Sequence, residues 1–400
     1  MSTHTPDTDE PDGGGPSGPD EASDEATDPI GKAEALSSFY DPRRNTYQAL
    51  EHPNPNQHHD ERSIREVYGY PRYERDSFGY PSVLPDMLEH DWDPDVDMSG
   101  GGTDALIRGK PGTGKSTLAC YMSERTMEIN NEKVVWRGSS SRSEWLPLAP
   151  WTRLCLPEGC DIKIALQSKD PTDPQIELDL DDLTEIVRDV VFYKDPTHLN
   201  HNLLEQGQFH VVYPDPRMNG CQEVLDNSSE RSYDPPSSDR PLFHHDDPAV
   251  HWWFAWALAR VEHGPHDFTT WIMDEMGDLC PQNARNDSFG TFQKVEMLKD
   301  TWVDMRKLGL SVYGFVHAET ELHSMIRRKI RWRIQMSGTA NPTGPGSTVG
   351  FDTVPMRVDQ TSRENTGTAL AYTETNFEKF RWSDMQQPND WKLKITPEEA

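Results

Sequence analysis

The sequence has few cysteines, and none of them lie at the spacing of a metal or redox site. They are odd in number and form no C-x-x-C pair: Cys120, Cys155, Cys160, Cys221 and Cys280. This argues against a disulfide framework and predicts reduced thiols. The pairs His58-His59 and His244-His245 have no second cluster at metal-ligand spacing. They are best interpreted as solvated loop histidines.

Long apolar runs are also absent. The longest, Trp252–Val261, is interrupted by Arg260 and is far shorter than the roughly 20 residues that a membrane-spanning helix needs. The first residues do not have the pattern of a signal peptide. We therefore expect no membrane insertion and a cytoplasmic location.

Basic residues are scarce, with 39 Lys and Arg against 68 Asp and Glu, a net charge of −29. The first thirty residues contain nine acids and no Lys or Arg. A segment so poor in apolar residues cannot offset its ordering entropy, so residues 1–60 are predicted to be a disordered acidic tail. Acids persist along the whole chain, which favours a salt-adapted surface over an acidic interaction tail. At molar salt the Debye length is about 3 Å, so this acidity does not exclude DNA as a partner.

Residues 61–100 differ from the tail because aromatic residues are interleaved with charges and prolines. The rings are those of Tyr68, Tyr70, Tyr73, Phe78 and Tyr80. Such a segment is typical of an extended strap that docks on the folded core, on a neighbouring subunit or on a partner protein. A nucleic-acid stacking surface is the alternative, disfavoured by the acids among the rings.

From residue 101 onward, strand-like and helix-like segments alternate, which predicts an α/β fold with a mostly parallel sheet and helices on both faces. Expected strands are Ala105–Arg108, Lys133–Arg137, Ile162–Gln167, Phe209–Tyr213, Thr270–Met273, Ser311–Val316 and Trp332–Met336. Expected helices are Lys115–Met127, Ala249–Glu262 and Phe289–Lys307. We expect a core over 101–340 with an inserted subdomain at about 139–247, and a C-terminal extension over 341–400 with a hairpin near Leu370–Trp382.

One segment fills every fixed position of the phosphate-binding pattern G-x-x-x-x-G-K-[ST], between an expected strand and an expected helix. The expected nucleotide-binding residues are Gly109, Lys110, Pro111, Gly112, Thr113, Gly114, Lys115, Ser116 and Thr117. Glycines let the backbone turn its N–H groups toward phosphates, and the following helix adds its positive end. Lys115 would reach the β- and γ-phosphates, and the Ser116 hydroxyl would ligate Mg²⁺. The expected ligands are ATP and Mg²⁺.

A second motif follows about 160 residues later, where the apolar run 269–273 ends in Asp274 and Glu275. Asp274 would hold Mg²⁺, and Glu275 would act as general base on the attacking water. Residues 274–277 also satisfy D-x-x-G, a GTPase motif, but the sequence has no N-K-x-D or T-K-x-D for guanine. The pattern therefore predicts an ATPase that forms ADP and phosphate.

The expected helix after this motif ends in basic residues and glycine, and an apolar strand then ends at His317. In a parallel sheet this places His317 beside the γ-phosphate, as a candidate sensor of hydrolysis.

This order of motifs resembles the HerA and FtsK group of ring-forming ATPases over roughly 103–338, although the tip residue is usually Gln where this chain has His317. The resemblance implies a RecA-like core, hexameric rings and an arginine supplied by the neighbouring subunit. In this chain Arg328 or Arg331 would be that arginine, in a segment of 8 basic and 4 acidic residues between Lys299 and Arg333. Together with the acidity, the resemblance implies a haloarchaeal protein, encoded by the host, a virus or a plasmid.

Two functions remain open. The first is an ATP-driven motor that translocates or packages DNA through a ring. The second is an ATP-driven protein assembly or remodelling factor with the aromatic strap as its docking arm, since no nucleic-acid-binding module is recognisable. A small-molecule kinase would need a lid and an acceptor site that we do not find.

Overall fold

The computed structural model describes residues 31–39, 87, 88, 90, 101–170, 172–228, 231–339, 360–374, 376–382 and 389–400. Most of the expected acidic tail lies outside the described residues. So do the aromatic residues of the expected strap.

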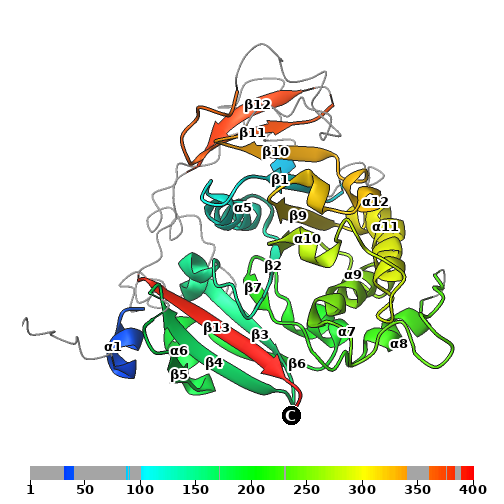
Figure 1. Ribbon diagram of the computed structural model, residues 1–400, viewed down its shortest axis with the longest axis horizontal. Coiled ribbons are helices and arrows are strands. Elements are labelled where there is room, and N and C mark those ends of the chain that lie inside the picture. Colours follow the sequence, from blue (N-terminus) through cyan, green and yellow to red (C-terminus); the bar gives the residue numbers. More distant parts are fainter. Residues whose placement is uncertain are drawn as a thin grey trace, which may run out of the picture.

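Ten strands form the main sheet, in the order β12-β11-β10-β1-β9-β8-β2-β7-β3-β6 (Figure 1). Their bounds are β12 Phe377–Arg381, β11 Thr368–Tyr372, β10 Trp332–Met336, β1 Asp104–Arg108, β9 Leu310–Val316, β8 Thr269–Met273, β2 Lys133–Arg137, β7 Phe209–Val212, β3 Thr152–Pro157 and β6 Asp189–Tyr193. Every pairing from β10 to β6 is parallel, whereas β11 pairs antiparallel with both β10 and β12. The predicted α/β fold with a mostly parallel sheet is confirmed, as is the hairpin.

Helices cover both faces of this sheet because its central strands are apolar on both sides. On β1, Ala105 and Ile107 join one core with helix α5 (Lys115–Asn130), whereas Leu106 joins the other core with α9 (Trp252–Glu262) and α11 (Thr291–Lys307). This alternation follows from the two-residue period of a strand. The shorter helices are α1 Lys32–Ser37, α6 Leu180–Ile186, α7 Pro196–His198, α8 Cys221–Asp226, α10 Met276–Leu279 and α12 Ser324–Arg327, with single turns at Leu146–Trp151, Leu199–Leu203, Ala249–His251 and Glu319–Glu321.

A second, antiparallel sheet has the order β13-β4-β5, with β13 Trp391–Glu398, β4 Asp161–Ser168 and β5 Ile176–Leu178. Only β4 and β5 of the region 139–247 belong to it. Strands β3, β6 and β7 of the same region extend the main sheet. Strands β3 and β7 are largely buried apolar runs; β7 pairs with β2, β3 pairs with β7, and β6 pairs with β3. The expected inserted subdomain is thus restricted to the small sheet, which the C-terminal strand β13 completes.

The expectation of disorder across residues 1–60 is wrong for residues 31–39. Helix α1 forms there, with Ala35 fully buried and Leu36 packed against the same core. Lys32 forms ion pairs with Asp179 and Asp182 at the start of α6. A short helix-favouring stretch with a small apolar face therefore docks beside the small sheet.

Part of the expected strap also contacts the core. Met87 and Leu88 are fully buried, and their carbonyl oxygens accept hydrogen bonds from Thr103 Oγ1 at 2.7 Å and Asn130 Nδ2 at 2.7 Å. His90 is buried between Glu132 and Thr103. These contacts fasten residues 87–90 to the beginnings of β1 and β2.

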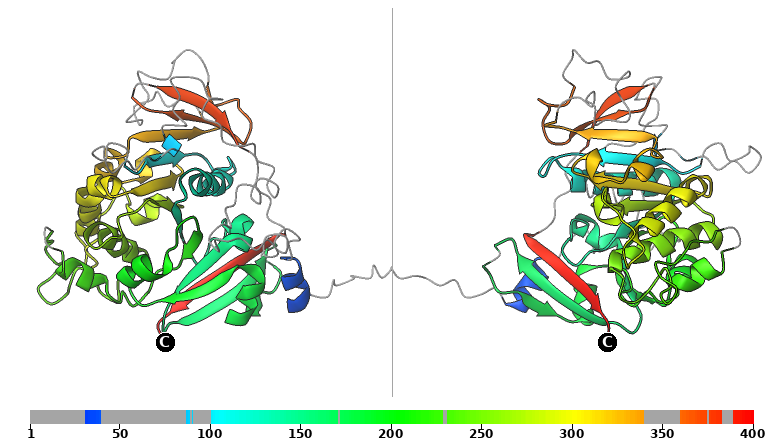
Figure 2. Two further views of the ribbon diagram at one scale, coloured as in Figure 1. Left: turned by 180° about the vertical axis from the view of Figure 1, so that it is seen from behind. Right: turned by 45° about the vertical axis from the view of Figure 1, so that its right-hand side comes forward.

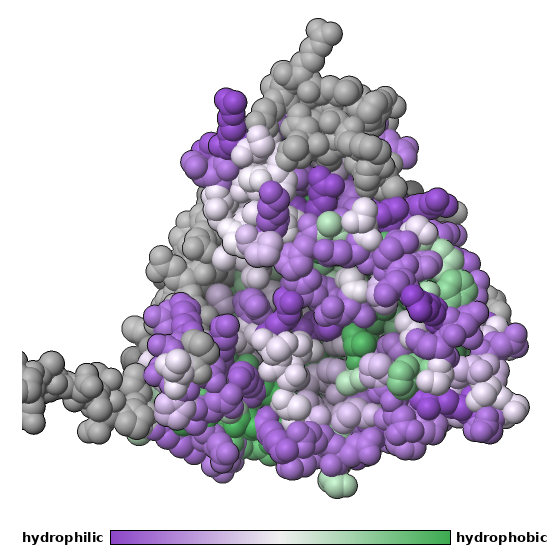
Figure 3. Space-filling model, in the orientation of Figure 1, coloured by the Kyte–Doolittle hydropathy of each residue, from purple (hydrophilic) through white to green (hydrophobic). Residues whose placement is uncertain are grey.

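The hairpin of β11 and β12 lies at the end of the molecule opposite to the small sheet (Figure 2). The surface seen in Figure 3 is largely hydrophilic, as the composition requires. Among the described residues, no helix is both long and apolar enough to cross a membrane.

Candidate nucleotide-binding site

The glycine-rich segment 109–116 joins the end of β1 to the start of α5, as the sequence pattern requires. Gly112 and Gly114 have φ angles of 78° and 87°, a left-handed conformation that side chains rarely adopt. A Cβ at Gly109 would lie 2.5 Å from Met336 Cγ, so β10 leaves no room for a larger residue there. The loop can therefore turn tightly and lead directly into the positive end of α5.

Strand β9 brings the two sequence motifs together. It lies between β1, which carries the glycine-rich loop, and β8, which ends directly before Asp274 and Glu275. The carboxyl ends of these parallel strands meet at one edge of the sheet, and His317 directly follows β9 at this edge. The expected position of His317 near the phosphate-binding loop depends on this strand order, which is set by packing.

A cavity of about 670 Å³ opens at this edge of the sheet. Its lining comes from the glycine-rich loop, both acids, the tip of β9, the segment after β2 and the C-terminal hairpin. The lining residues are Pro111, Gly112, Gly114, Lys115, Ser116, Thr117, Arg142, Glu144, Asp274, Glu275, His317, Thr366, Gly367 and Trp382.

His317 links Lys115 to Glu275. The ammonium Nζ of Lys115 lies 3.0 Å from His317 Nδ1, and His317 Nε2 lies 3.0 Å from Glu275 Oε1. An ammonium can only donate, so Nδ1 accepts and Nε2 carries the proton that points at the carboxylate. The residue that touches the phosphate-binding lysine is thus in direct contact with the candidate general base.

Lys115 is buried, with 8% of its surface exposed, and Nζ also donates to the Gly109 carbonyl at 2.7 Å. Burial lowers the pKa of Lys115, although the carboxylates of Glu275 and Asp274 oppose this. The ammonium is therefore held at the mouth of the loop, where a triphosphate would compensate its buried charge.

Arg142 is the principal site residue that the sequence patterns did not reveal. Its Nη1 atom lies 3.1 Å from Asp274 Oδ2 and 3.1 Å from Glu275 Oε1. Burial works against this charge, yet the two carboxylates hold the pKa of Arg142 above its ordinary value. The guanidinium thus neutralises the pair of acids that would face Mg²⁺ and the attacking water.

Arg137, the last residue of β2, fixes the backbone beneath these acids. Its Nη1 atom donates to the carbonyls of Asp274 at 2.7 Å and Glu275 at 3.0 Å. Glu275 has a φ of 52°, which is unusual for a residue with a side chain and costs on the order of 1–3 kcal/mol. The bonds from Arg137 help to hold this strained backbone and thereby aim the Glu275 carboxylate into the cavity.

Ser116 and Asp274 line the same cavity, so the hydroxyl and carboxylate expected to bind Mg²⁺ are brought together. Oxygen ligands of this kind suit Mg²⁺, which usually binds through one or two protein groups together with phosphate oxygens. Glu144 adds a third carboxyl group, and burial followed by the nearby charge of Asp274 raises its pKa. The residues present therefore fit the cation.

The arginines predicted to act between subunits lie away from this cavity. Arg331 pairs with Asp104 at 2.7 Å, at the start of β1 and so at the opposite edge of the sheet from the glycine-rich loop. Arg328 is exposed, and its side chain has no partner among the described residues. Arg333 is buried and donates to the backbone carbonyls of Ile330 and Arg327, which is a structural role.

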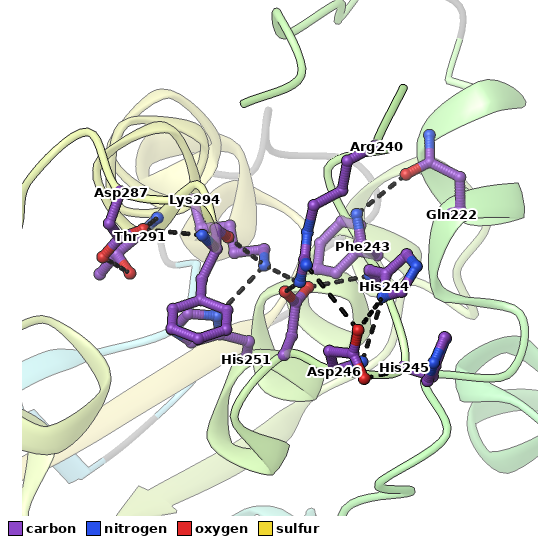
Figure 4. Close-up of polar contacts among 12 residues, drawn as sticks. Gln222, Arg240, Phe243, His244, His245, Asp246, His251, Asp287, Thr291 and Lys294 are labelled. Atoms are coloured by element: carbon purple, nitrogen blue, oxygen red, sulfur yellow. Dashed lines mark hydrogen bonds and ion pairs between the residues drawn. The ribbon is translucent and has the colours of Figure 1, made fainter. Parts of the chain in front are cut away.

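Figure 4 shows a charge cluster at the start of α11, whose residues do not line the cavity. Lys294 Nζ lies 2.7 Å from Asp247 Oδ2 and 3.1 Å from His251 Nδ1, and Arg240 lies 2.5 Å from the other Asp247 oxygen. Side chains of Lys294 and Asp247 are fully buried, so the pair fastens α11 to the segment before α9. Next to it, His244, His245 and Asp246 lie close enough together to hold a metal ion, but they are partly or fully exposed and already contact one another.

No family model and no curated protein matches this chain. Among solved structures it is similar to the genome packaging NTPase B204 of Sulfolobus turreted icosahedral virus 2 in complex with ATP-γ-S, with 10% identity over 71% of this chain and 98% of that chain and a TM-score of 0.38. It is also similar to the cytoplasmic domain of the Type VII secretion ATPase EccC of Thermomonospora curvata, with 12% identity over 80% of this chain and 32% of that one and a TM-score of 0.33. These values are too low to transfer a function to this chain.

Proposed function

We propose that this chain is a Mg²⁺-dependent ATPase that converts ATP to ADP and phosphate. The observation that supports this most is the continuous contact from Lys115 through His317 to Glu275 at the end of the glycine-rich loop. A site that only held phosphate would need the loop and the lysine, but it would not need an oriented carboxylate beside them. The combination is the one that in-line attack of water on a γ-phosphate requires.

In this proposal each residue has a defined task. Lys115 binds the β- and γ-phosphates, and Glu275 accepts the proton of the attacking water. His317 positions the Glu275 carboxylate through its Nε2 proton. Through its contact with Lys115, it senses whether a γ-phosphate is bound. Mg²⁺, bound through Ser116 and Asp274, supplies neutralisation of the phosphate charge.

Arg142 has two possible partners in the reaction. In the structure it pairs with Asp274 and Glu275. Its planar fork also suits phosphate oxygens, and Arg142 lines the cavity in which a triphosphate would lie. Arg142 would then stabilise the transition state from within the same subunit.

We further propose that hydrolysis drives the movement of DNA through a ring of subunits, with Arg328 of one subunit reaching the ATP of the next. This rests on the order of the motifs and on Arg328, which lies in a basic segment of an otherwise acidic chain. An arginine that acts on a neighbour needs to be solvent-accessible and free of internal ion pairs. Arg328 is exposed, and within the part of the chain that the structure describes its side chain forms no ion pair.

The deciding experiment measures ATP turnover at molar KCl, with and without double- and single-stranded DNA, for the wild type and Glu275→Gln. We expect DNA to raise the turnover of the wild type. Glu275→Gln should bind ATP but turn it over at least 100-fold more slowly. Unchanged turnover in Glu275→Gln contradicts the role of the base. If neither form of DNA changes the rate of ATP turnover, the DNA motor is contradicted and a protein substrate is favoured.

A further inference from the structure

The cavity has two chemically different ends. Glu275, His317 and Arg142 form one end, and they come from β8, β9 and the segment after β2. Thr366, Gly367 and Trp382 form the other end; the first two directly precede β11 and Trp382 directly follows β12, at the base of the C-terminal hairpin. The glycine-rich loop lies between the two, as β1 lies between β9 and β10 in the sheet.

This order sets the direction in which a nucleotide would lie. Lys115 contacts His317, so the γ-phosphate belongs at the end with the acids. The chain of phosphates is linear, and the rest of the nucleotide therefore extends along the loop toward Thr117 and the C-terminal hairpin. The aromatic side chain found there is Trp382.

Trp382 is held firmly in this position. Its backbone N–H donates to the Gly367 carbonyl at 3.1 Å, and its indole Nε1 donates to Thr117 Oγ1 at 3.2 Å. A Cβ placed on Gly114 would lie 3.4 Å from the indole Cζ2 atom, so the ring packs directly over the glycine-rich loop. The ring of Phe380 in β12 packs beside the indole, with 5.8 Å between the two ring centroids.

Trp382 is largely buried, with 8% of its surface exposed, and its indole nitrogen is already hydrogen-bonded to Thr117. The part of the ring that borders the cavity is therefore an edge of carbon atoms. Such a surface suits a flat aromatic ligand and offers nothing to a phosphate or a carboxylate. Contacts between aromatic side chains and nucleobases typically contribute about five- to 150-fold in affinity.

We propose that Trp382 is the nucleobase-binding residue of this site, against which the base of ATP packs, an inference that rests on the proposed ATP-binding function. The C-terminal hairpin is then part of the nucleotide site and not only an edge of the sheet. Because an aromatic face tolerates any base, this contact confers affinity for nucleotides in general and does not select adenine.

The test compares a ligand that has a base with one that has none. Dissociation constants are measured by calorimetry, with Mg²⁺ at molar KCl, for the β,γ-imido analogue of ATP and for inorganic tripolyphosphate. The variants are Trp382→Ala, Trp382→Phe and, as a control from the same hairpin, Phe377→Ala, whose side chain is partly exposed and does not line the cavity.

We expect the wild type to bind the ATP analogue more tightly than tripolyphosphate. Trp382→Ala should raise the dissociation constant of the analogue about tenfold or more and leave that of tripolyphosphate unchanged. Trp382→Phe and Phe377→Ala should bind both ligands nearly as the wild type does. If Trp382→Ala does not fold, Trp382→Leu keeps apolar packing without an aromatic ring and carries the same comparison.

Three results would overturn the inference. An unchanged affinity for the analogue in Trp382→Ala removes the base contact. An equal loss for both ligands means that the indole only shapes the loop. A wild type that binds both ligands equally has no base site but keeps its phosphate site. A wild type that binds neither ligand contradicts the proposed function itself.

Discussion

The Nε2 atom of His317 lies 3.0 Å from Oε1 of Glu275, while the Nδ1 atom of the same ring accepts from Lys115. A single side chain thus accepts a hydrogen bond from one partner and donates one to the other. A carboxamide can do the same, since its oxygen accepts and its nitrogen donates. A glutamine at position 317 could therefore make the same two contacts.

The first prediction follows directly. His317→Gln should keep ATP turnover within a fewfold of the wild type, whereas His317→Leu should lower it about 100-fold, because Glu275 loses its positioning contact. Steady-state turnover with saturating ATP is the measurement, and nucleotide affinity serves as the control for folding. Equal activity of the Gln and Leu variants would show that the two contacts of His317 are not needed.

Arg142 leads to a prediction about metal dependence. Removing its charge in Arg142→Ala leaves Asp274 and Glu275 close together without their shared cation, which should destabilise the free protein by about 1–3 kcal/mol. Mg²⁺ can replace the missing charge, so MgCl₂ should raise the melting temperature of Arg142→Ala more than that of the wild type.

A remote ion pair provides the control for this comparison. Arg217 pairs with Asp215 at 3.1 Å and does not line the cavity. In Arg217→Ala, Mg²⁺ should have only the effect that it has on the wild type. If Mg²⁺ raises the melting temperature of both variants equally, the acids in the cavity are not the metal ligands.

Arg328 can be tested by mixing subunits. Arg328→Ala should bind ATP normally and turn it over about 1,000-fold more slowly. Lys115→Ala should lose both ATP binding and ATP turnover. A mixed ring contains sites in which an intact Lys115 faces an intact Arg328 from the neighbour, so mixing two inactive variants should restore measurable turnover. No recovery on mixing, with rings shown to exchange subunits, would contradict action between subunits. Arg331→Ala serves as the comparison, because its side chain pairs with Asp104 inside the same chain.

Stability should fall as the pH drops below neutral. Burial followed by the charge of Lys294 lowers the pKa of His251 to about 4, and burial lowers the pKa of His210 to about 3. In the unfolded chain both histidines take up protons near pH 6.5. The unfolded state therefore binds more protons as the pH falls from 6.5 to 4, and each histidine removes stability on the order of 3 kcal/mol across that window.

Urea unfolding at constant salt between pH 7 and 4 measures this effect. His251→Gln keeps a hydrogen-bond acceptor for Lys294 but cannot titrate, so its stability should fall less steeply with pH. His201→Gln, at an exposed position, should retain the slope of the wild type. Identical slopes for the wild type and His251→Gln would show that His251 is not the titrating group.

Much of the fold could be predicted from local patterns. Runs such as Lys133–Arg137 and Trp332–Met336 became β2 and β10 with unchanged bounds, because their β-branched and aromatic residues favour strands. The glycine-rich loop and the acids after β8 could also be predicted, because their chemistry requires fixed residues at fixed spacing.

The remaining parts depend on contacts between distant residues. Arg137 and Arg142 lie more than 130 residues before the acids that they bind, and no local pattern marks an arginine as a partner of a particular carboxylate. Trp382 reaches the glycine-rich loop only because β10, β11 and β12 are neighbours in the sheet. Helix α1 was missed because the composition of the surrounding tail outweighed its six residues.

The pairing of β4 with β13 sets the order in which this protein can be completed during synthesis. Ser168 lies opposite Trp391. A ribosome that adds about 5–20 residues per second therefore needs on the order of 10–40 s to synthesise the chain from the first of these residues to the second. Throughout this interval the apolar side chains Ile164 and Leu166 lack the partner strand that later helps to bury them. The small sheet should therefore be the last part of the molecule to fold and the part from which aggregation begins.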